Sequence, residues 1–133
     1  MKDYQKYIFD VDYTLLIPDW SEEDNYFRKN IAIEEQEEFF KQKLDIVVKY
    51  EDTHSRYDYK VLSDYFLSYG FHLSEELIEG WMIHNGDAIV DEIPDGIKEL
   101  FEYLKENNKE IIVLSNWPSI TQVMRLKKTG LYE

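Results

Sequence analysis

Two aspartates, separated by one residue, follow an apolar run near the start of the chain. Asp10 and Asp12 end the segment YIFDVD, and Thr14 comes two residues later. Because residues i and i+2 of an extended segment point to the same side, both carboxylates can reach one spot. Ligands of open parallel sheets bind at the carboxyl ends of the strands. The pair therefore indicates a site for chemistry, and an Asx-type turn or a helix cap is the structural alternative.

A second apolar run ends in small polar residues in the same way. In IIVLSN, residues 111–116, the apolar stretch leads to Ser115 and Asn116, and Pro118 then begins a predicted helix. If the two strands are neighbours, Ser115 lies close to the aspartates, and the start of the helix favours an anion. A hydroxyl, a helix start and two carboxylates together indicate phosphate with a divalent cation. Plain turn chemistry before a helix is the alternative.

The elements that position these residues follow from hydrophobic spacing. Strands are predicted at residues 6–11 and 110–114, and their continuously apolar character suits a parallel sheet covered on both faces. Apolar residues at helical spacing predict helices in the remaining segments. These are residues 21–51 as one helix or two, 59–70 ending at Gly70, 74–86 opened by Ser74 and closed by Gly86, 97–108, and 118–130.

This order of elements predicts an α/β fold. The sequence runs strand, helical block, helix, strand, helix, so the helical block is an insertion into an α/β unit. We expect the boundaries of the insertion near Ile17 and Asp91.

Composition narrows the class of protein. The 133 residues suffice for one ordinary domain with a sizeable core. Asp and Glu number 28 against 15 for Lys and Arg, a formal charge of −13, which argues against nucleic acid or an anionic membrane surface as a partner. Cysteine is absent, and no signal peptide or membrane-spanning run is recognisable. We expect a cytoplasmic protein.

The two motifs together resemble those of the haloacid dehalogenase-like (HAD) hydrolase superfamily. FDVDYT, residues 9–14, resembles its first motif and IIVLSN its second, and the helical block between them resembles the first class of cap. SNWPSITQVMRLKKTGL is similar to the same segment of nucleotide-phosphatase-like members. The resemblance implies a Rossmann-like HAD core with an incomplete parallel sheet, formed by residues 1–16 and 92–133, and an inserted helical cap formed by residues 17–91.

The resemblance also implies a reaction. It is Mg²⁺-dependent hydrolysis of a small phosphorylated metabolite, with a nucleotide as one option, through an aspartyl-phosphate. Asp10 matches the nucleophile, and Asp12 matches the general acid/base, which disfavours dehalogenation because a halide needs no proton. Mg²⁺ would be held by the Asp10 carboxylate and the Asp12 backbone carbonyl. Phosphate would be bound through Thr14, Ser115 and Asn116, with Thr14 also positioning the aspartates.

Two aromatic residues beside the motifs have open roles. Relatives often have glycine, asparagine or aspartate at position 13, where this chain has Tyr13. That tyrosine is expected either to line the entrance to the site or to pack against the cap. Trp117 follows the second motif and is expected to face the substrate or the cap.

Two elements that the resemblance implies are missing from the 133 residues. They are a third-motif lysine and a fourth-motif acidic pair, and Lys127 and Lys128 follow Ser115 too closely to supply the lysine. We therefore expect this chain to be the N-terminal part of a longer protein, to be inactive alone, and to form a homodimer that covers its open sheet edge. The alternative is a catalytically incomplete phosphate- or Mg²⁺-binding or assembly protein.

Overall fold

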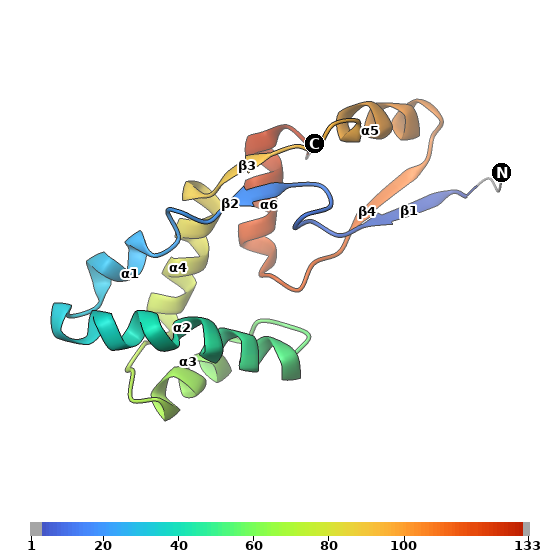
Figure 1. The fold of residues 1–133 in the computed structure, drawn as a ribbon. Helices are drawn as coiled ribbons and strands as arrows, with labels where there is room; N and C mark the ends of the chain where they lie inside the picture. The colour runs from blue at the N-terminus through green and yellow to red at the C-terminus, as the bar shows by residue number, and fades with distance from the viewer. Residues whose placement is uncertain (1–3, 132–133) are drawn as a thin grey trace.

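A two-stranded parallel sheet holds the two motifs. The computed structural model of the protein describes residues 4–131. In it β1 (Lys6–Phe9) pairs in parallel with β4 (Glu110–Val113), and Phe9 lies opposite Val113 (Figure 1). The mixed α/β class is confirmed, and the two strands are neighbours, which is the condition for Ser115 to lie close to the aspartates. Both motifs therefore begin at the same edge of this sheet.

A second, shorter sheet lies where the helical block leaves and rejoins the chain. β2 (Ile17–Asp19) pairs with β3 (Val90–Glu92) in the antiparallel direction, and Pro18 lies opposite Asp91. Neither strand is predicted from the sequence, because three residues are too few to show a period. Between them run the four helices of the block, which are α1 (Asn25–Asn30), α2 (Ile33–Thr53), α3 (Tyr59–Ser68) and α4 (Glu75–Ala88) (Figure 1).

Aromatic side chains form the core of the helical block. The ring of Phe27 lies 4.9 Å from those of both Phe39 and Trp81, and all three side chains are buried. The predicted cap at Ser74 is confirmed, since its hydroxyl accepts the N–H of Leu77 at 3.1 Å. No helix within residues 4–131 has the length and apolar character needed to cross a membrane.

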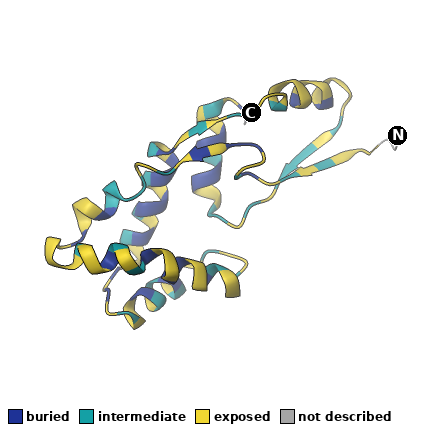
Figure 2. Ribbon diagram, viewed as in Figure 1, coloured by how far each residue is buried: buried dark blue, intermediate teal, exposed yellow. Residues whose placement is uncertain are grey.

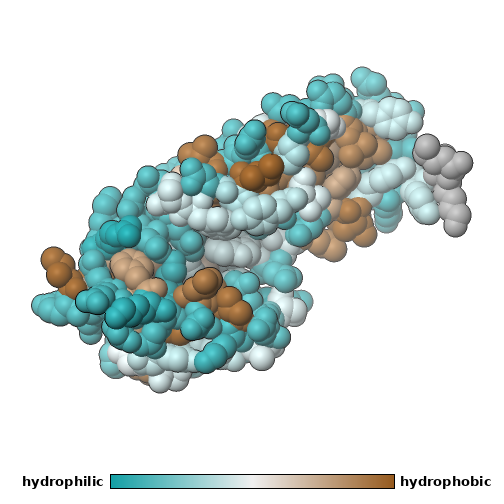
Figure 3. Space-filling model, viewed as in Figure 1, coloured by the Kyte–Doolittle hydropathy of each residue, from teal (hydrophilic) through white to brown (hydrophobic). Residues whose placement is uncertain are grey.

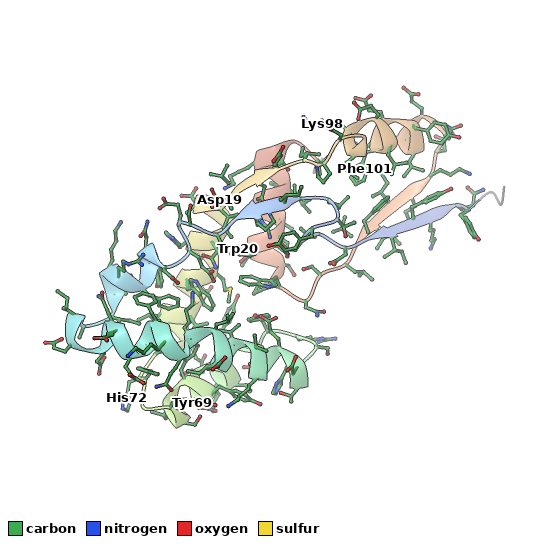
Figure 4. All side chains as sticks on the ribbon, viewed as in Figure 1. Asp19, Trp20, Tyr69, His72, Lys98 and Phe101 are labelled. Carbon is green, nitrogen blue, oxygen red and sulfur yellow. The ribbon has the colours of Figure 1, made fainter. Side chains whose placement is uncertain are left out.

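Two further helices complete the fold, and the first of them packs against the parallel sheet. α5 (Ile97–Glu106) precedes β4, and α6 (Ser119–Thr129) follows it. Phe101 of α5 points toward the sheet, where its ring lies 5.2 Å from that of Phe9 (Figure 4). α6 packs along α4 (Figure 1). Its Leu126 also joins the buried apolar cluster that contains Val11 and Phe101, so α6 contacts both parts of the molecule. Buried residues accordingly gather along α4 and α6 (Figure 2).

One face of the strand pair is exposed, although the continuously apolar character of the strands suits a sheet that is covered on both faces. The side chains of Ile8 and Leu114 are 62% and 60% exposed. Apolar surface gathers on the part of the molecule that holds β1, β4 and α5 (Figure 3). The reason is that, within residues 4–131, helices pack against only one face of the β1–β4 pair. The opposite face of the pair stays bare.

The predicted end of a helix at Gly86 is wrong. α4 continues through Gly86 to Ala88, and Gly86 is buried against α6. A Cβ atom at this position would lie 2.7 Å from Met124 Sδ and 3.0 Å from Met124 Cβ. Close approach of two helices therefore explains this glycine, rather than helix termination.

Gly86→Ala is expected to lower the free energy of unfolding by about 1 kcal/mol. Overpacking against Met124 costs about 1–3 kcal/mol, and the better helix propensity of alanine offsets up to about 1 kcal/mol of that. Urea denaturation measures the change. Combining the substitution with Met124→Ala relieves the clash, so the double variant should be more stable than the sum of the single effects predicts. A stabilising single variant would show that α4 and α6 are not in close contact here.

Candidate active site

A tight turn after β1 presents the two aspartates. The Val11 carbonyl accepts the N–H groups of Thr14, Leu15 and Leu16 at 2.9–3.2 Å. The side chains of Val11, Leu15 and Leu16 are fully buried, so they hold the turn against the apolar core. The polar residues of the first motif are thereby left on a turn with a fixed backbone.

Tyr13 adopts a backbone conformation that tyrosine rarely has. Its φ is +61°, in the left-handed region where glycine, asparagine and aspartate are favoured. The ring is 68% exposed, and its hydroxyl accepts the indole N–H of Trp20 at 3.1 Å. Trp20 lies where the helical block meets the rest of the chain (Figure 4). The Tyr13 side chain thus contacts the start of the helical block, and backbone strain of this kind clusters at functional sites.

Replacing Tyr13 tests this conformation. Tyr13→Val is expected to be about 1–2 kcal/mol less stable than Tyr13→Asn, because a β-branched residue is strained at positive φ. Urea denaturation of both variants gives the difference. The matched control is the same pair of substitutions at Tyr103, an exposed residue of α5, where the two variants should differ by no more than about 0.5 kcal/mol. Equal stability of the two Tyr13 variants would show that the turn does not hold this conformation.

The two aspartates have different surroundings. Asp10 is exposed, and its Oδ1 accepts the N–H of Val11 at 2.8 Å. Asp12 is partly buried, with a side chain that is 21% exposed. Asp10 is therefore open to a ligand, whereas Asp12 is held by the protein.

A glutamine joins Asp12 to the second motif. Gln122 of α6 donates one amide group, Nε2, to Asp12 Oδ2 at 3.2 Å and to Ser115 Oγ at 2.9 Å. The structure thus brings Asp12 and Ser115 to one place. Ser115 Oγ also accepts the N–H of Trp117 at 3.2 Å, which is the turn chemistry that the sequence left as an alternative.

A buried arginine binds both Asp12 and Asp91. Arg125 Nη1 lies 2.8 Å from Asp12 Oδ1, an ion pair that is not aligned as a hydrogen bond. Its Nε and Nη2 donate to the two carboxylate oxygens of Asp91 at 3.0 and 2.6 Å. Burial opposes the charge of Arg125, but the hydrogen bonds to Asp91 and the negative charges of Asp12 and Asp91 outweigh it and raise the pKa of the guanidinium above its ordinary value.

Sequence reasoning missed Gln122, Arg125 and Asp91 as site residues. Gln122 and Arg125 are three positions apart, so they share one face of α6. The buried residues of this helix also include Thr121 and Leu126. Two large polar residues at helical spacing next to Leu126 were the available signal. Asp91 was named only as a boundary, and nothing local to the sequence links it to Asp12.

Thr14 and Asn116 are exposed, and they take no part in the network around Asp12. Asn116 instead lines a cavity of about 610 Å³ between the α2–α3 loop and the β4–α6 loop. Arg56 and Tyr57 line it from the helical block, and Ser115 and Trp117 line it from the other side. Of the network around Asp12, only Ser115 borders this cavity, which residues of both parts of the molecule line.

Two oxygen groups at the turn are open to a ligand. The Asp12 carbonyl accepts no backbone hydrogen bond from residues 4–131, and the Asp10 carboxylate is exposed. Mg²⁺ is commonly held by one or two protein oxygens together with water and substrate phosphate. No group of three or more acidic, histidine or cysteine side chains gathers anywhere in the described part of the chain. Lys128 donates to the carbonyls of Asp87 and Ile89, so it stabilises the end of α4 rather than the site.

Comparison with known proteins identifies no relative of this chain. No protein-family model matches the chain, and no curated protein or solved structure matches it.

Proposed function

We propose that the chain carries the nucleophile and the acid/base of a Mg²⁺-dependent phosphatase acting on small phosphorylated metabolites, as its resemblance to HAD hydrolases implies. One observation carries the proposal. The carboxyl ends of β1 and β4 bring Asp10, Asp12 and Ser115 to one sheet edge, and Gln122 joins the last two. Phosphoryl transfer to a carboxylate needs a nucleophile, an acid/base and a phosphate ligand close together, and this sheet edge offers a candidate for each.

The first half of the proposed reaction forms an aspartyl-phosphate. A carboxylate oxygen of Asp10 attacks phosphorus, and the bond from phosphorus to the leaving oxygen breaks. Asp12 gives its proton to that oxygen, so an alcohol leaves. The exposed Asp10 suits the nucleophile because its carboxylate is accessible to a ligand.

The second half releases phosphate. Asp12 accepts a proton from water while the water oxygen attacks phosphorus, and the bond from phosphorus to Asp10 breaks. Ser115 suits a phosphate ligand because its oxygen already accepts from Gln122 Nε2 and from the N–H of Trp117. The hydroxyl hydrogen of Ser115 then points away from these two donors and can donate to a phosphate oxygen.

The net charge of −13 makes a cation necessary for an anionic substrate. Bound Mg²⁺ supplies positive charge that screens the attack of one anion on another. The Asp10 carboxylate and the Asp12 carbonyl are the atoms that would hold it. The neighbouring cavity of about 610 Å³ would take the organic part of a small substrate.

The proposal is tested with the protein expressed from its natural gene. Its intact mass is measured first, and hydrolysis of p-nitrophenyl phosphate is then followed with Mg²⁺ and with EDTA. We expect turnover that requires Mg²⁺. For the 133-residue chain alone we expect no turnover but Mg²⁺-dependent binding of trifluoroberyllate, a mimic of the aspartyl-phosphate, by ¹⁹F NMR. Absence of both turnover and binding contradicts the proposal.

A second candidate is an assembly protein. The bare face of the β1–β4 sheet favours it, as does the outer edge of β1, which pairs with no strand within residues 4–131. Lys6 and Ile8 lie on this face, and Asp10 follows two residues later. In an antiparallel pair of β1 strands centred on Ile8, Lys6 of one copy faces Asp10 of the other, so the charges match. Sedimentation equilibrium distinguishes the two candidates, because a dimer that Ile8→Lys dissociates supports assembly and a monomer contradicts it.

A further inference from the structure

One helix holds the carboxylate of Asp12 at both oxygens. Arg125 Nη1 lies 2.8 Å from Oδ1, and Gln122 Nε2 donates to Oδ2. The Gln122 amide cannot turn round, because its Oε1 accepts from Arg125 Nη1 at 2.9 Å. Arg125 therefore contacts Asp12 directly and also fixes the orientation of Gln122, the other side chain that contacts Asp12.

Arg125 is at the same time bound to β3. Asp91 accepts two hydrogen bonds from the guanidinium, a bidentate geometry that tolerates little displacement. Both side chains are 0% exposed. Asp91 lies opposite Pro18 in the sheet at which the helical block leaves and rejoins the chain. A shift of β3 relative to α6 would break both bonds and release one side of Arg125.

This network is poorly explained as a device for stability alone. Buried ion pairs are seldom more stabilising than apolar side chains of the same volume. Here one guanidinium serves two carboxylates that come from distant parts of the chain. Asp91 is the fully buried end, and Asp12, with a side chain that is 21% exposed, is the end that reaches the site.

We propose that Arg125 is a positioning residue that fixes Asp12 for proton transfer and, through Asp91, makes that placement depend on the docking of β3. The inference rests on the proposed phosphatase function. In that reaction the proton moves from Asp12 to the leaving oxygen as the bond from phosphorus to that oxygen breaks. Misplacing the carboxyl group slows that transfer, while attack by Asp10 is unaffected.

The first test compares leaving groups. Arg125→Lys keeps the charge but cannot form the bidentate contact, and Asp91→Asn keeps the shape but loses the charge. For the protein from its natural gene, kcat/KM is measured for glycerol 3-phosphate, whose alkoxide needs a proton, and for p-nitrophenyl phosphate, whose phenolate does not. We expect the ratio of the two constants, glycerol 3-phosphate over p-nitrophenyl phosphate, to fall about tenfold to a hundredfold in both variants.

Asp24→Asn, which removes a partner of Lys43 within the helical block, is the control and should leave the ratio unchanged. An equal loss for both substrates overturns the positioning role.

The second test needs no turnover. The N–H groups of Tyr13, Leu15 and Leu16 are hydrogen-bonded within the turn, so their exchange with solvent reports its opening. We expect Asp91→Asn to speed their exchange about tenfold and Asp24→Asn to leave it unchanged. Unchanged exchange in Asp91→Asn overturns the coupling between β3 and Asp12. If the wild-type protein neither hydrolyses these phosphates nor binds trifluoroberyllate, the proposed function fails, and exchange alone then decides whether Arg125 couples β3 to the turn.

Discussion

Asp10→Asn is expected to abolish Mg²⁺-dependent phosphate hydrolysis, by at least about a thousandfold in kcat, without changing the fold. The amide cannot act as the nucleophile, so no aspartyl-phosphate forms. The local structure should survive because asparagine keeps the oxygen that accepts the N–H of Val11. The free energy of unfolding should change by no more than about 0.5 kcal/mol, since the side chain is exposed.

Asp19→Asn is the matched control for this experiment. Asp19 is also exposed, ends β2, and accepts a backbone N–H, that of Ser21, at 2.9 Å (Figure 4). That hydrogen bond favours the charged form and lowers the pKa of Asp19 below its ordinary value. The substitution Asp19→Asn should leave turnover intact. Hydrolysis that persists in Asp10→Asn would mean that Asp10 is not the nucleophile, and the proposed function would then be wrong.

The sequence was sufficient to predict the frame that holds the motifs. Two apolar runs, each ending in small polar residues, identified the neighbouring strands β1 and β4, because hydrophobic runs and their ends are local features. The helical insertion followed from spacing of the same kind. Gly86 was misinterpreted because a helix-terminating glycine and a glycine at a helix contact look alike without the partner helix, and here the partner residue is Met124.

The contacts of Asp12 could not be predicted in the same way. They join residues 12, 91 and 125, which are distant in sequence and are brought together only by the packing of α6 against β3. The exposed face of β1 and β4 is a similar case. Apolar residues on both sides of a strand indicate burial on both faces, but they do not say which segment or molecule covers each face.

Arg125→Met is expected to lower the free energy of unfolding by about 3–5 kcal/mol. The substitution leaves the carboxylate of Asp91 without its bidentate partner, at a position where the side chain is 0% exposed. An uncompensated buried charge costs about that much. Urea denaturation measures the loss, and circular dichroism shows whether the variant is folded at the start of the titration.

Lys43→Met provides the matched control, because Lys43 is also a buried cation with two acidic partners. The side chains of Glu23 and Asp24 are 19% and 35% exposed, so water can reach both carboxylates once the lysine is gone. The cost should therefore be about 1–2 kcal/mol, well below that of Arg125→Met. Similar losses in the two variants would mean that Asp91 also gains water, and that the network around Arg125 is looser than its contacts indicate.

A double substitution separates stability from positioning. Arg125→Met with Asp91→Leu removes both buried charges, and an apolar pair of similar volume often restores the stability that one unpaired charge loses. We expect most of the loss to be recovered, while the proton transfer assigned to Asp12 stays impaired because only Gln122 still holds its carboxylate. A stable double variant with normal turnover of an alkyl phosphate would show that Asp12 needs no arginine to place it. A stable variant that turns over only substrates with good leaving groups would show that the arginine serves the reaction rather than the fold.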